Sequence, residues 1–498
     1  MPDPIETAAA RRRMRGELLG AGAAALLVLA AFVVPQIASE SWRERLFAGA
    51  APIFGWWSPH IGWGTLPAIA LAAIVVVRGP ALARRLRWRP LLGAGYATAL
   101  AWAFTLALVD GWERGFTARL ADGHEYLAEV PGVTDIPLML DTFAGRILDG
   151  QTDSWTTHVS GHPPGALLFF VLLDRLGLGG PAWAGIACVI IGCSAPIAVA
   201  VALRALGSEN RARAALPFLV LAPAAIWIGV SADALFAGVT SWAVALLAVA
   251  TRAGHRSSLV NRFCRPGSLR GDDTGVSGLP IRSRERRDRH GAAEFEIPST
   301  VPGRRGGRGA VPAAVGAGTL FGFGIYLNYG LVLMGFVAVA VLVAARAARP
   351  LLPAVFGAVL VVAAFTVAGF WWFEGYHLVV ERYYQGIATD RPYGYWWWGN
   401  LAATVCAVGL ATAAALPRAL ARLRTLEPAA LLVAGAVCAI AAADISGLSK
   451  AETERIWLPF DIWLLVATAY LPHARARPWL AVQAAGALLL VHLLFTNW

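Results

Sequence analysis

Long apolar runs recur from one end of this chain to the other, and they constrain its fold more than any other feature. Each run has 17–23 residues, enough for a helix to cross a hydrocarbon core about 30 Å thick. Only 15% of the residues are charged, against about 25% in a typical soluble domain. Lipid offers no hydrogen-bond partners to a peptide backbone, so these runs must be helical. The sequence predicts an all-α, polytopic transmembrane bundle.

Arginine predicts which ends of these helices face the cytoplasm. The formal net charge is +11, and Lys450 is the only lysine of the chain. Basic residues gather at 11–13 and 78–89, on both sides of the first spans. Cytoplasmic loops of membrane proteins carry an excess of such residues, so we expect a cytoplasmic N-terminus. This bias explains the basic balance, and we expect no nucleic-acid partner.

Thirteen spans follow from the apolar runs and this orientation, with an extracytoplasmic C-terminus. The stretch 164–178 is short and interrupted by Asp174-Arg175, and we predict a juxtamembrane or re-entrant helix there. The predicted spans lie near 17–39, 62–79, 90–109, 181–203, 213–230, 233–251, 311–327, 330–346, 351–372, 397–416, 428–445, 457–472 and 478–496.

Composition divides the chain into four regions. Residues 1–89 hold two spans and a basic cytoplasmic loop, and residues 90–251 form a core that carries a large outer loop, 110–163, with juxtamembrane helices. Residues 252–310 are rich in Arg, Gly, Ser and Pro without a hydrophobic period, which predicts a disordered cytoplasmic loop. Residues 311–498 contain the remaining spans, with outer loops at 374–398 and 444–456.

Carboxylates and histidines gather in the outer loop 110–163. Asp110 ends a span and Glu113 follows three residues later, so the two share a helix face if the helix continues. Either carboxylate could act as a general base, and a solvated helix end is the alternative. His158 and His162 could make structural hydrogen bonds or contact phosphate or metal. Their spacing does not match a tetrahedral zinc site, and we predict no metal site.

Arginines on the outer side run against the positive-inside bias. Three of them directly follow an acid, namely Arg382 after Glu381, Arg391 after Asp390, and Arg455 after Glu454. Each arginine could therefore form a local ion pair, or its guanidinium could bind a lipid-linked phosphate. The phosphate interpretation is best for Arg455, because Lys450 is close by. The neighbouring Trp396–Trp398 more simply anchor the chain at the membrane interface than bind sugar.

One stretch of sequence resembles a known class of enzymes. A span ending in Asp110 leads through the long outer loop to Thr157-His158-Val159-Ser160-Gly161-His162-Pro163-Pro164-Gly165. Together with Asp233 at a span start and Glu454-Arg455 before Trp457, this layout resembles membrane glycosyltransferases of the GT-C class. Protein O-mannosyltransferases and the bacterial aminoarabinose and polyprenyl-phosphate-dependent sugar transferases are the most similar types. The resemblance covers roughly residues 90 to 460.

This resemblance implies inverting transfer of a sugar from a polyprenyl-phosphate donor to an envelope glycan or lipid on the outer face of the cell membrane. It gives Asp110 the catalytic carboxylate position, with Glu113 as the alternative, and it leaves a divalent cation cofactor open. The substrate contacts that we expect are His158, His162, Asp233, Tyr329, Arg382, Arg391, Lys450, Glu454 and Arg455. Of these, Arg455 with Lys450 or Arg391 would neutralise the leaving phosphate.

The chain departs from the family pattern at two places. Gly165 stands where the family often has Leu, and Asp110 is separated from Glu113 where mannosyltransferases have adjacent acids. The Ala-rich, Arg-rich and Lys-poor composition suggests a high-GC bacterium such as an actinobacterium.

Two other functions remain open. A transporter or flippase for lipid-linked sugars would have ionisable residues in mid-span and symmetry between its halves. A non-catalytic scaffold for envelope assembly would tolerate substitution of Asp110, His162 and Arg455 alike. We see no internal repeat in the sequence, which favours the transferase.

Overall fold

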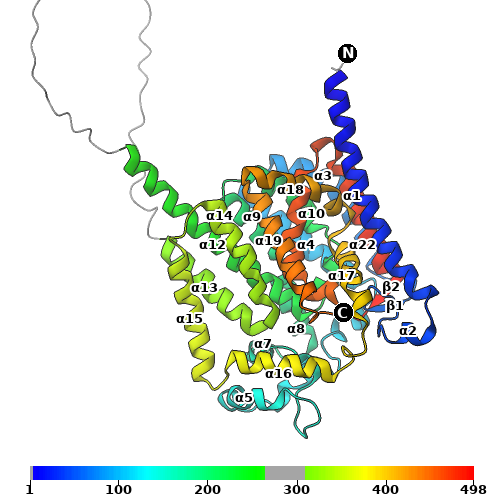
Figure 1. The fold of residues 1–498 in the computed structure, drawn as a ribbon, viewed down its shortest axis with the longest axis vertical. Helices are drawn as coiled ribbons and strands as arrows, with labels where there is room; N and C mark the ends of the chain where they lie inside the picture. Colours follow the sequence, from blue (N-terminus) through cyan, green and yellow to red (C-terminus); the bar gives the residue numbers. More distant parts are fainter. Residues whose placement is uncertain (1–3, 264–308, 498) are drawn as a thin grey trace, which may run out of the picture.

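Helices make up nearly all the regular structure of the computed structural model, which describes residues 4–263 and 309–497 (Figure 1). The all-α prediction is therefore confirmed, apart from one short antiparallel pair of strands, β1 (Gly55–Trp57) and β2 (Leu494–Thr496). The helices before the large basic loop are α1 (Pro4–Ile37), α2 (Glu40–Glu44), α3 (Thr65–Arg85), α4 (Trp88–Ala107), α5 (Ile136–Thr142), α6 (Thr157–Ser160), α7 (Pro164–Arg175), α8 (Pro181–Gly192), α9 (Ala195–Ala205), α10 (Glu209–Val220), α11 (Ala225–Ile228) and α12 (Ala232–Phe263). Those after it are α13 (Ala310–Leu327), α14 (Gly335–Ala345), α15 (Leu351–Val367), α16 (Trp372–Gln385), α17 (Tyr393–Val408), α18 (Leu410–Ala421), α19 (Pro428–Ile445), α20 (Thr453–Ile456), α21 (Leu458–Leu464) and α22 (Ala476–Leu493).

The number of helices able to cross a membrane is smaller than predicted. Within the described residues, eight helices are long and apolar enough, or ten if each of two bent pairs counts as one span. The predicted spans 213–230 and 457–472 are instead broken into short helices, and 397–416 bends by 103° between α17 and α18. Their residues are largely buried inside the bundle. An apolar run therefore indicated burial here without distinguishing a protein neighbour from lipid.

Helix α7 agrees with the short helix predicted at 164–178. Pro164 occupies its first turn, where a missing N–H costs nothing. Its 12 residues give a length of about 18 Å, well short of a hydrocarbon core of about 30 Å. Helix α7 packs closely against α13 at Gly165, because a Cβ atom there would lie 2.5 Å from the carbonyl oxygen of Tyr326. This backbone contact explains the glycine at a position where the resembling family often has leucine.

Replacing Gly165 should therefore disrupt the packing of α7 on α13. We expect Gly165→Leu to lower stability by more than the roughly 1–3 kcal/mol of ordinary overpacking, because the obstacle is backbone. A thermal-shift measurement in detergent checks this, with Gly93→Leu as the control. Gly93 is exposed and nothing lies within 4 Å of a Cβ there, so that variant should unfold close to the wild-type temperature. Equal midpoints for wild type and Gly165→Leu would contradict the close contact.

Two predicted loops are partly helical. The segment 374–398 contains most of α16, which is bent by 74° from α15, and the start of α17. In Figure 1, α16 lies across the ends of the long helices, beside α5. Helix α12 continues to Phe263, beyond the predicted start of the basic loop 252–310. The remainder of that loop, from 264 to 308, lies outside the described residues.

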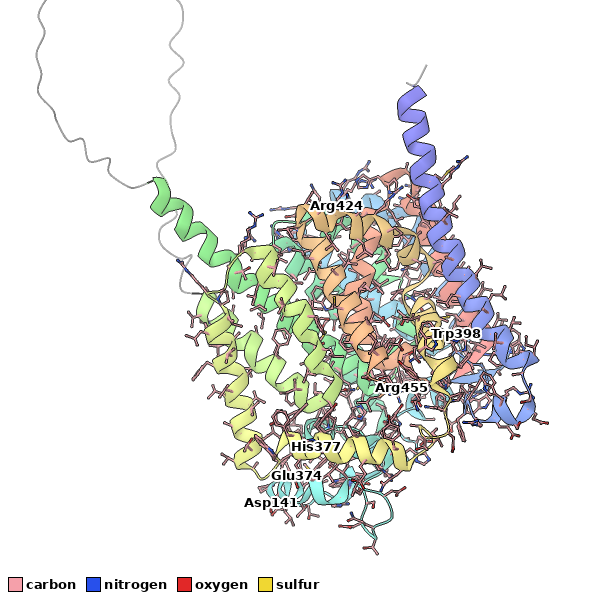
Figure 2. All side chains as sticks on the ribbon, viewed as in Figure 1. Asp141, Glu374, His377, Trp398, Arg424 and Arg455 are labelled. Atoms are coloured by element: carbon pink, nitrogen blue, oxygen red, sulfur yellow. The ribbon has the colours of Figure 1, made fainter. Side chains whose placement is uncertain are left out.

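The first and last long helices run in the same direction, which defines two opposite ends of the bundle. At one end, buried Glu17 of α1 accepts a hydrogen bond from Arg475, just before α22, at 2.9 Å. At the other end, β1 follows α1 and pairs with β2, which follows α22. Helices α1 and α22 therefore run in the same direction, and the chain ends at the opposite side from where it begins. Figure 2 shows Arg424 near the first end, and Asp141, Glu374 and His377 at the other. We refer to this second end as the outer end, in keeping with the predicted orientation.

Candidate active site

Arg455 is the centre of a buried ion-pair network near the outer end. Its Nη1 donates to Oδ2 of Asp233 at 2.7 Å, and its Nη2 donates to Oε2 of Glu452 at 2.6 Å. The second carboxylate oxygen of Glu452 lies 3.3 Å from Nη1 of Arg391. These four side chains come from the first turn of α12, the turn α20 and its approach, and the segment before α17. The fold thus joins three parts of the chain that are far apart in sequence.

The backbone around Glu452 is strained in a way that serves this network. Ala451 and Glu452 have φ angles of 71° and 62°, in the left-handed region that side-chain-bearing residues seldom adopt. Strain of this kind persists where the surroundings enforce it, commonly at functional sites. Here the turn directs the Glu452 carboxylate between Arg391 and Arg455. Burial alone would raise the pKa of Glu452, but the two guanidiniums outweigh it and hold the pKa below its ordinary value.

A carboxylate of the first outer loop joins the same cluster. Oε1 of Glu125 lies 3.6 Å from Nε2 of His158, and among the described residues its Oε2 has no hydrogen-bond partner. Burial raises the pKa of Glu125 to about 8, although the positive charge of Arg455 opposes the shift and Asp233 adds to it. Oδ1 of Asp233 is likewise buried without a hydrogen-bond partner in the described part of the chain.

The two predicted histidines line this cluster. Nδ1 of His162 donates to the carbonyl oxygen of His158 at 2.8 Å, which leaves its Nε2 to face other groups. The His162 ring packs between Tyr126 and Phe236, with centroids 5.7 and 5.6 Å away. Burial lowers the pKa of both histidines, and Arg455 adds to this for each. We therefore expect neutral imidazoles, which can exchange hydrogen bonds with hydroxyl groups.

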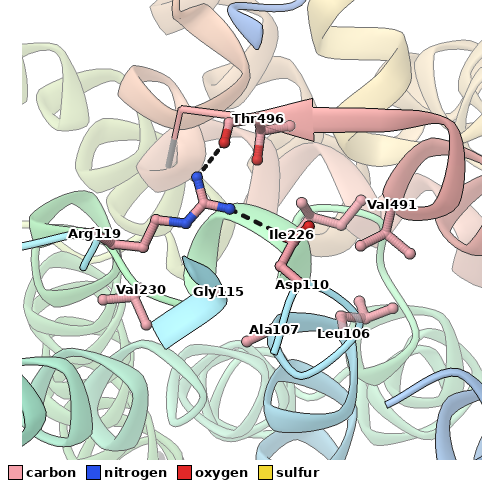
Figure 3. A pocket seen from close by; sticks show the side chains of 9 residues that line it. All are labelled: Leu106, Ala107, Asp110, Gly115, Arg119, Ile226, Val230, Val491 and Thr496. Atoms are coloured by element: carbon pink, nitrogen blue, oxygen red, sulfur yellow. Dashed lines mark hydrogen bonds and ion pairs between the residues drawn. The ribbon is translucent and has the colours of Figure 1, made fainter. Parts of the chain in front are cut away.

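Asp110 belongs to a different network. Its Oδ1 lies 2.8 Å from Nε2 of His60, and its Oδ2 lies 3.1 Å from Nη2 of Arg119. Arg119 also donates to the carbonyl oxygen of Thr496 on β2 (Figure 3). Burial raises the pKa of Asp110, while Arg119 and His60 oppose the shift. The network ties the beginning of the first outer loop to the strand pair that closes the outer end.

The cavity beside Asp110 is too small for a sugar. It measures about 10 Å³, room for about one water molecule. Its lining includes Arg119, Val230 and Thr496, and it does not include Arg455 (Figure 3). Asp110, which the family resemblance places at the catalytic position, therefore borders a cavity that Arg455 does not line.

Glu113 does not share a helix face with Asp110. Helix α4 ends at Ala107, and Gly111 then adopts a φ of +88°, which redirects the chain before a new turn begins at Glu113. The side chain of Glu113 is exposed.

The outer arginines form ion pairs, but not with the acids beside them in sequence. Arg382 on α16 lies 2.5 Å from Oδ2 of Asp149 and donates to Oγ of Ser160 at 3.3 Å. Arg391 and Arg455 pair with Glu452 and Asp233, as described above. The ion pairs found in the described residues are instead with Asp149 for Arg382, Glu452 for Arg391, and Asp233 and Glu452 for Arg455.

Three other predicted contacts have distinct surroundings. Nζ of Lys450 donates to the carbonyl oxygen of Ala388 at 2.9 Å, and its backbone N–H donates to Tyr383 Oη at 3.0 Å. Tyr329 is buried against Trp372, with ring centroids 5.4 Å apart. Glu454 is fully buried, and its Oε1 accepts a hydrogen bond from the backbone of Phe54 at 2.8 Å.

The structure adds Glu125 and Glu452 to the residues that the sequence suggested. Neither belongs to a motif with fixed spacing, and the contact of Glu125 with the Arg455 cluster depends on the folded path of the outer loop. No group of three or more His, Cys, Asp or Glu side chains in the described ranges has a geometry suited to a metal ion.

Comparison with other proteins gives little further information. The chain matches no protein-family profile and no curated protein. Among solved structures it is similar to ArnT from Cupriavidus metallidurans in the apo state, with 13% identity and a TM-score of 0.43. The similarity covers 81% of this chain and 77% of that one. A likeness at this level decides nothing about function, which has to be argued from the site itself.

Proposed function

We propose that the chain is a membrane glycosyltransferase of the GT-C type. It transfers a sugar, with inversion, from a polyprenyl-phosphate donor to a glycan or lipid acceptor outside the cytoplasm. The observation that supports this most is the buried cluster at the outer end, in which Glu125 and Asp233 accompany Arg455 and two neutral histidines. Such a cluster offers a proton acceptor, fixed positive charge and hydrogen-bonding groups at the outer end, where the proposed lipid-linked donor would be bound.

Glu125 is the general base in this proposal. An acceptor hydroxyl gives its proton to the Glu125 carboxylate as its oxygen forms a bond to the anomeric carbon of the donor sugar. The bond from that carbon to the phosphate oxygen breaks, and the phosphate leaves with the electron pair. Attack from the opposite side inverts the anomeric configuration. The pKa of about 8 for Glu125 suits a base, since catalytic bases work best with a pKa near the operating pH.

Asp110 is the base suggested by the family resemblance, and it remains a second candidate. Its carboxylate already accepts a hydrogen bond from Arg119 and lies 2.8 Å from Nε2 of His60. These partners favour a structural role, and the two carboxylates can be separated by substitution, as set out in the Discussion.

Lys450 is the best candidate for the leaving phosphate. The charge of Arg455 is already balanced by Asp233 and Glu452, and Arg391 shares Glu452. The ammonium group of Lys450 has a carbonyl oxygen as its hydrogen-bond partner and, in the described part of the chain, forms no ion pair. Burial and the nearby Arg391 lower the pKa of Lys450, as expected for a cation in a positive surrounding that an incoming phosphate would relieve.

The pH dependence of transfer follows from the base. Glu125 has to be ionised to accept a proton, and its pKa of about 8 lies above its usual value, so kcat/KM should rise about tenfold per pH unit up to about pH 8 and level off above it. The measurement uses detergent-solubilised protein with a lipid-linked sugar extract. The exposed Glu113→Gln variant serves as a control and should keep this profile. A rate that is flat from pH 6 upward would remove Glu125 as the base.

The reaction itself is tested by mass spectrometry of envelope glycans and lipid-linked sugars from a deletion strain. We expect one sugar to be missing from a glycan or lipid, while the lipid-linked form of the same sugar accumulates. Unchanged glycans together with an unchanged lipid-linked pool would contradict the proposal.

A flippase for lipid-linked sugars is the second candidate, favoured by one observation. Asp461 lies in α21, in the segment 457–472 that is broken into short helices, and it is fully buried inside the bundle, as ionisable residues on transport pathways often are. Transfer of label from lipid-linked sugar to acceptor by the purified protein in detergent decides between the two. A flippase needs two membrane faces and would yield no product in that assay.

A further inference from the structure

Three polar side chains lie along one face of the segment that follows Arg455. Helical hydrogen bonds run from the N–H of Trp457 to the carbonyl of Thr453, and from the N–H of Asp461 to the carbonyl of Trp457. The segment is therefore close to helical through α20 and α21. Side chains three or four positions apart then lie above one another, which places Glu454, Trp457 and Asp461 on a common face.

Each of these side chains is buried with an unused polar atom. Glu454 and Asp461 are 0% exposed, and Trp457 is 1% exposed. Within the described residues, Oε2 of Glu454, Nε1 of Trp457 and both carboxylate oxygens of Asp461 have no hydrogen-bond partner. More than nine-tenths of buried polar groups in native proteins are satisfied, so this group indicates that something occupies or neutralises the site.

Negative charges dominate the surroundings of this site in the described part of the chain. Asp461 and Glu454 repel each other, and Glu452 adds a further negative charge beside Glu454. Arg455 is the cation close to Glu454, but Asp233 and Glu452 hold its two terminal nitrogens. Cys406 also faces Glu454, as a thiol. Two ionised carboxylates here would be like charges in a low-dielectric interior, an arrangement that proteins avoid by binding a proton.

We propose that Glu454 and Asp461 form a proton-binding site that stays loaded at neutral pH. One proton held by the pair leaves it with a single negative charge. The buried polar atoms on this face that can share that proton and charge are the unpaired Oε2 of Glu454, the two carboxylate oxygens of Asp461 and the Trp457 Nε1–H. Burial raises the pKa of Glu454 to about 7, although the Phe54 N–H opposes the shift. This raised pKa is consistent with a proton that Glu454 and Asp461 share at neutral pH.

The bound proton has a consequence for the neighbouring cluster. With the pair loaded, Arg455 is balanced by Asp233 and Glu452. With the proton lost, Glu454 and Asp461 are both ionised, and the added negative charge makes Glu454 compete more strongly with Asp233 and Glu452 for the same guanidinium. Loss of the proton from the Glu454–Asp461 pair would therefore make the ion pairs of Arg455 sensitive to pH, although Asp461 does not itself pair with Arg455.

Infrared difference spectroscopy on the full-length protein in lipid tests the proposal without any assay of transfer. We expect a protonated-carboxyl carbonyl absorption at pH 7 in wild type that loses intensity in Asp461→Asn and in Glu454→Gln. Asp149→Asn is the matched control. Asp149 is 58% exposed and paired with Arg382, so its substitution should leave that absorption unchanged. Equal absorption in wild type and both site variants would overturn the proposal.

Thermal unfolding supplies a second readout. Asparagine resembles a protonated aspartic acid, so Asp461→Asn should unfold within a few degrees of wild type at pH 6. At pH 9 the wild type loses the proton and retains a buried charge, so the variant should be the more stable of the two. A wild-type midpoint that rises with sodium concentration and falls in Asp461→Asn would instead show a bound metal cation, and would also overturn proton binding.

Discussion

Glu125→Gln is expected to reduce transfer by about 10²–10⁴-fold, the usual contribution of a general base. The glutamine keeps the size of the side chain but cannot accept a proton at any working pH. Because the buried carboxylate of the wild type is itself largely protonated below pH 8, the neutral amide should not impair folding. We therefore expect an unchanged melting temperature at pH 7, with KM affected much less than kcat. The measurement is single-turnover transfer from a lipid-linked sugar extract.

The Asp110→Asn variant tests whether Asp110, rather than Glu125, is the general base. If Asp110 is structural, the variant should retain transfer within a few fold and lose thermal stability, because a buried group that pairs with Arg119 and His60 has lost its charge. The opposite outcome, in which Asp110→Asn abolishes transfer while Glu125→Gln does not, would return the base to the carboxylate suggested by the family resemblance.

Replacing Arg455 should have the largest effect on stability. In Arg455→Met, the carboxylate of Asp233 would stay buried without its ion-pair partner, and Glu452 would keep only Arg391. Removing one member of a buried ion pair typically costs about 3–5 kcal/mol. Arg455→Lys should restore only part of the lost stability. In the wild type, two different guanidinium nitrogens donate to Asp233 and Glu452, at 2.7 and 2.6 Å, and a single ammonium group cannot reproduce both hydrogen bonds. Thermal or denaturant unfolding in detergent gives the difference.

Two controls separate the loss of a buried ion pair from the loss of arginine itself. Arg382→Met removes an arginine whose partner, Asp149, is 58% exposed, and exposed pairs contribute only about 0–1 kcal/mol. The double variant Asp233→Asn with Arg455→Met should recover part of the stability lost in the single variant, because it removes one of the stranded charges. Equal destabilisation by Arg382→Met and Arg455→Met would contradict the proposed importance of the buried network.

Much of the architecture could be predicted from the sequence, because its cause is local. Apolar length identified most of the helices, and the short helix predicted from residue 164 does begin there. The arrangement of the outer end could not be predicted in the same way. Helix α16 mixes aromatic and charged residues, so it has no apolar run to reveal it. Breaks such as Gly409, with a φ of +79°, depend on packing that no short window of sequence contains.

The contacts within the candidate site were even harder to predict from the sequence than the helices. His158, His162, Asp233 and Arg455 were recognised as candidates from residue type and position, and the structure brings them together. Their partners were not recognised, because each contact joins segments that only the folded chain brings close. The nearest acid in sequence proved a poor guide for Arg391 and Arg455, and Glu125 carried no signal beyond its place in a polar loop.

Complementation of the deletion strain tests the central claim most directly. Wild-type protein and the Glu125→Gln variant are expressed at equal levels, and mass spectrometry measures the ratio of one sugar on envelope glycan to the same sugar on lipid phosphate. We predict that wild type restores the ratio while the variant leaves the sugar on its lipid carrier. A variant that restores the ratio as fully as wild type would contradict catalysis by the buried cluster around Arg455.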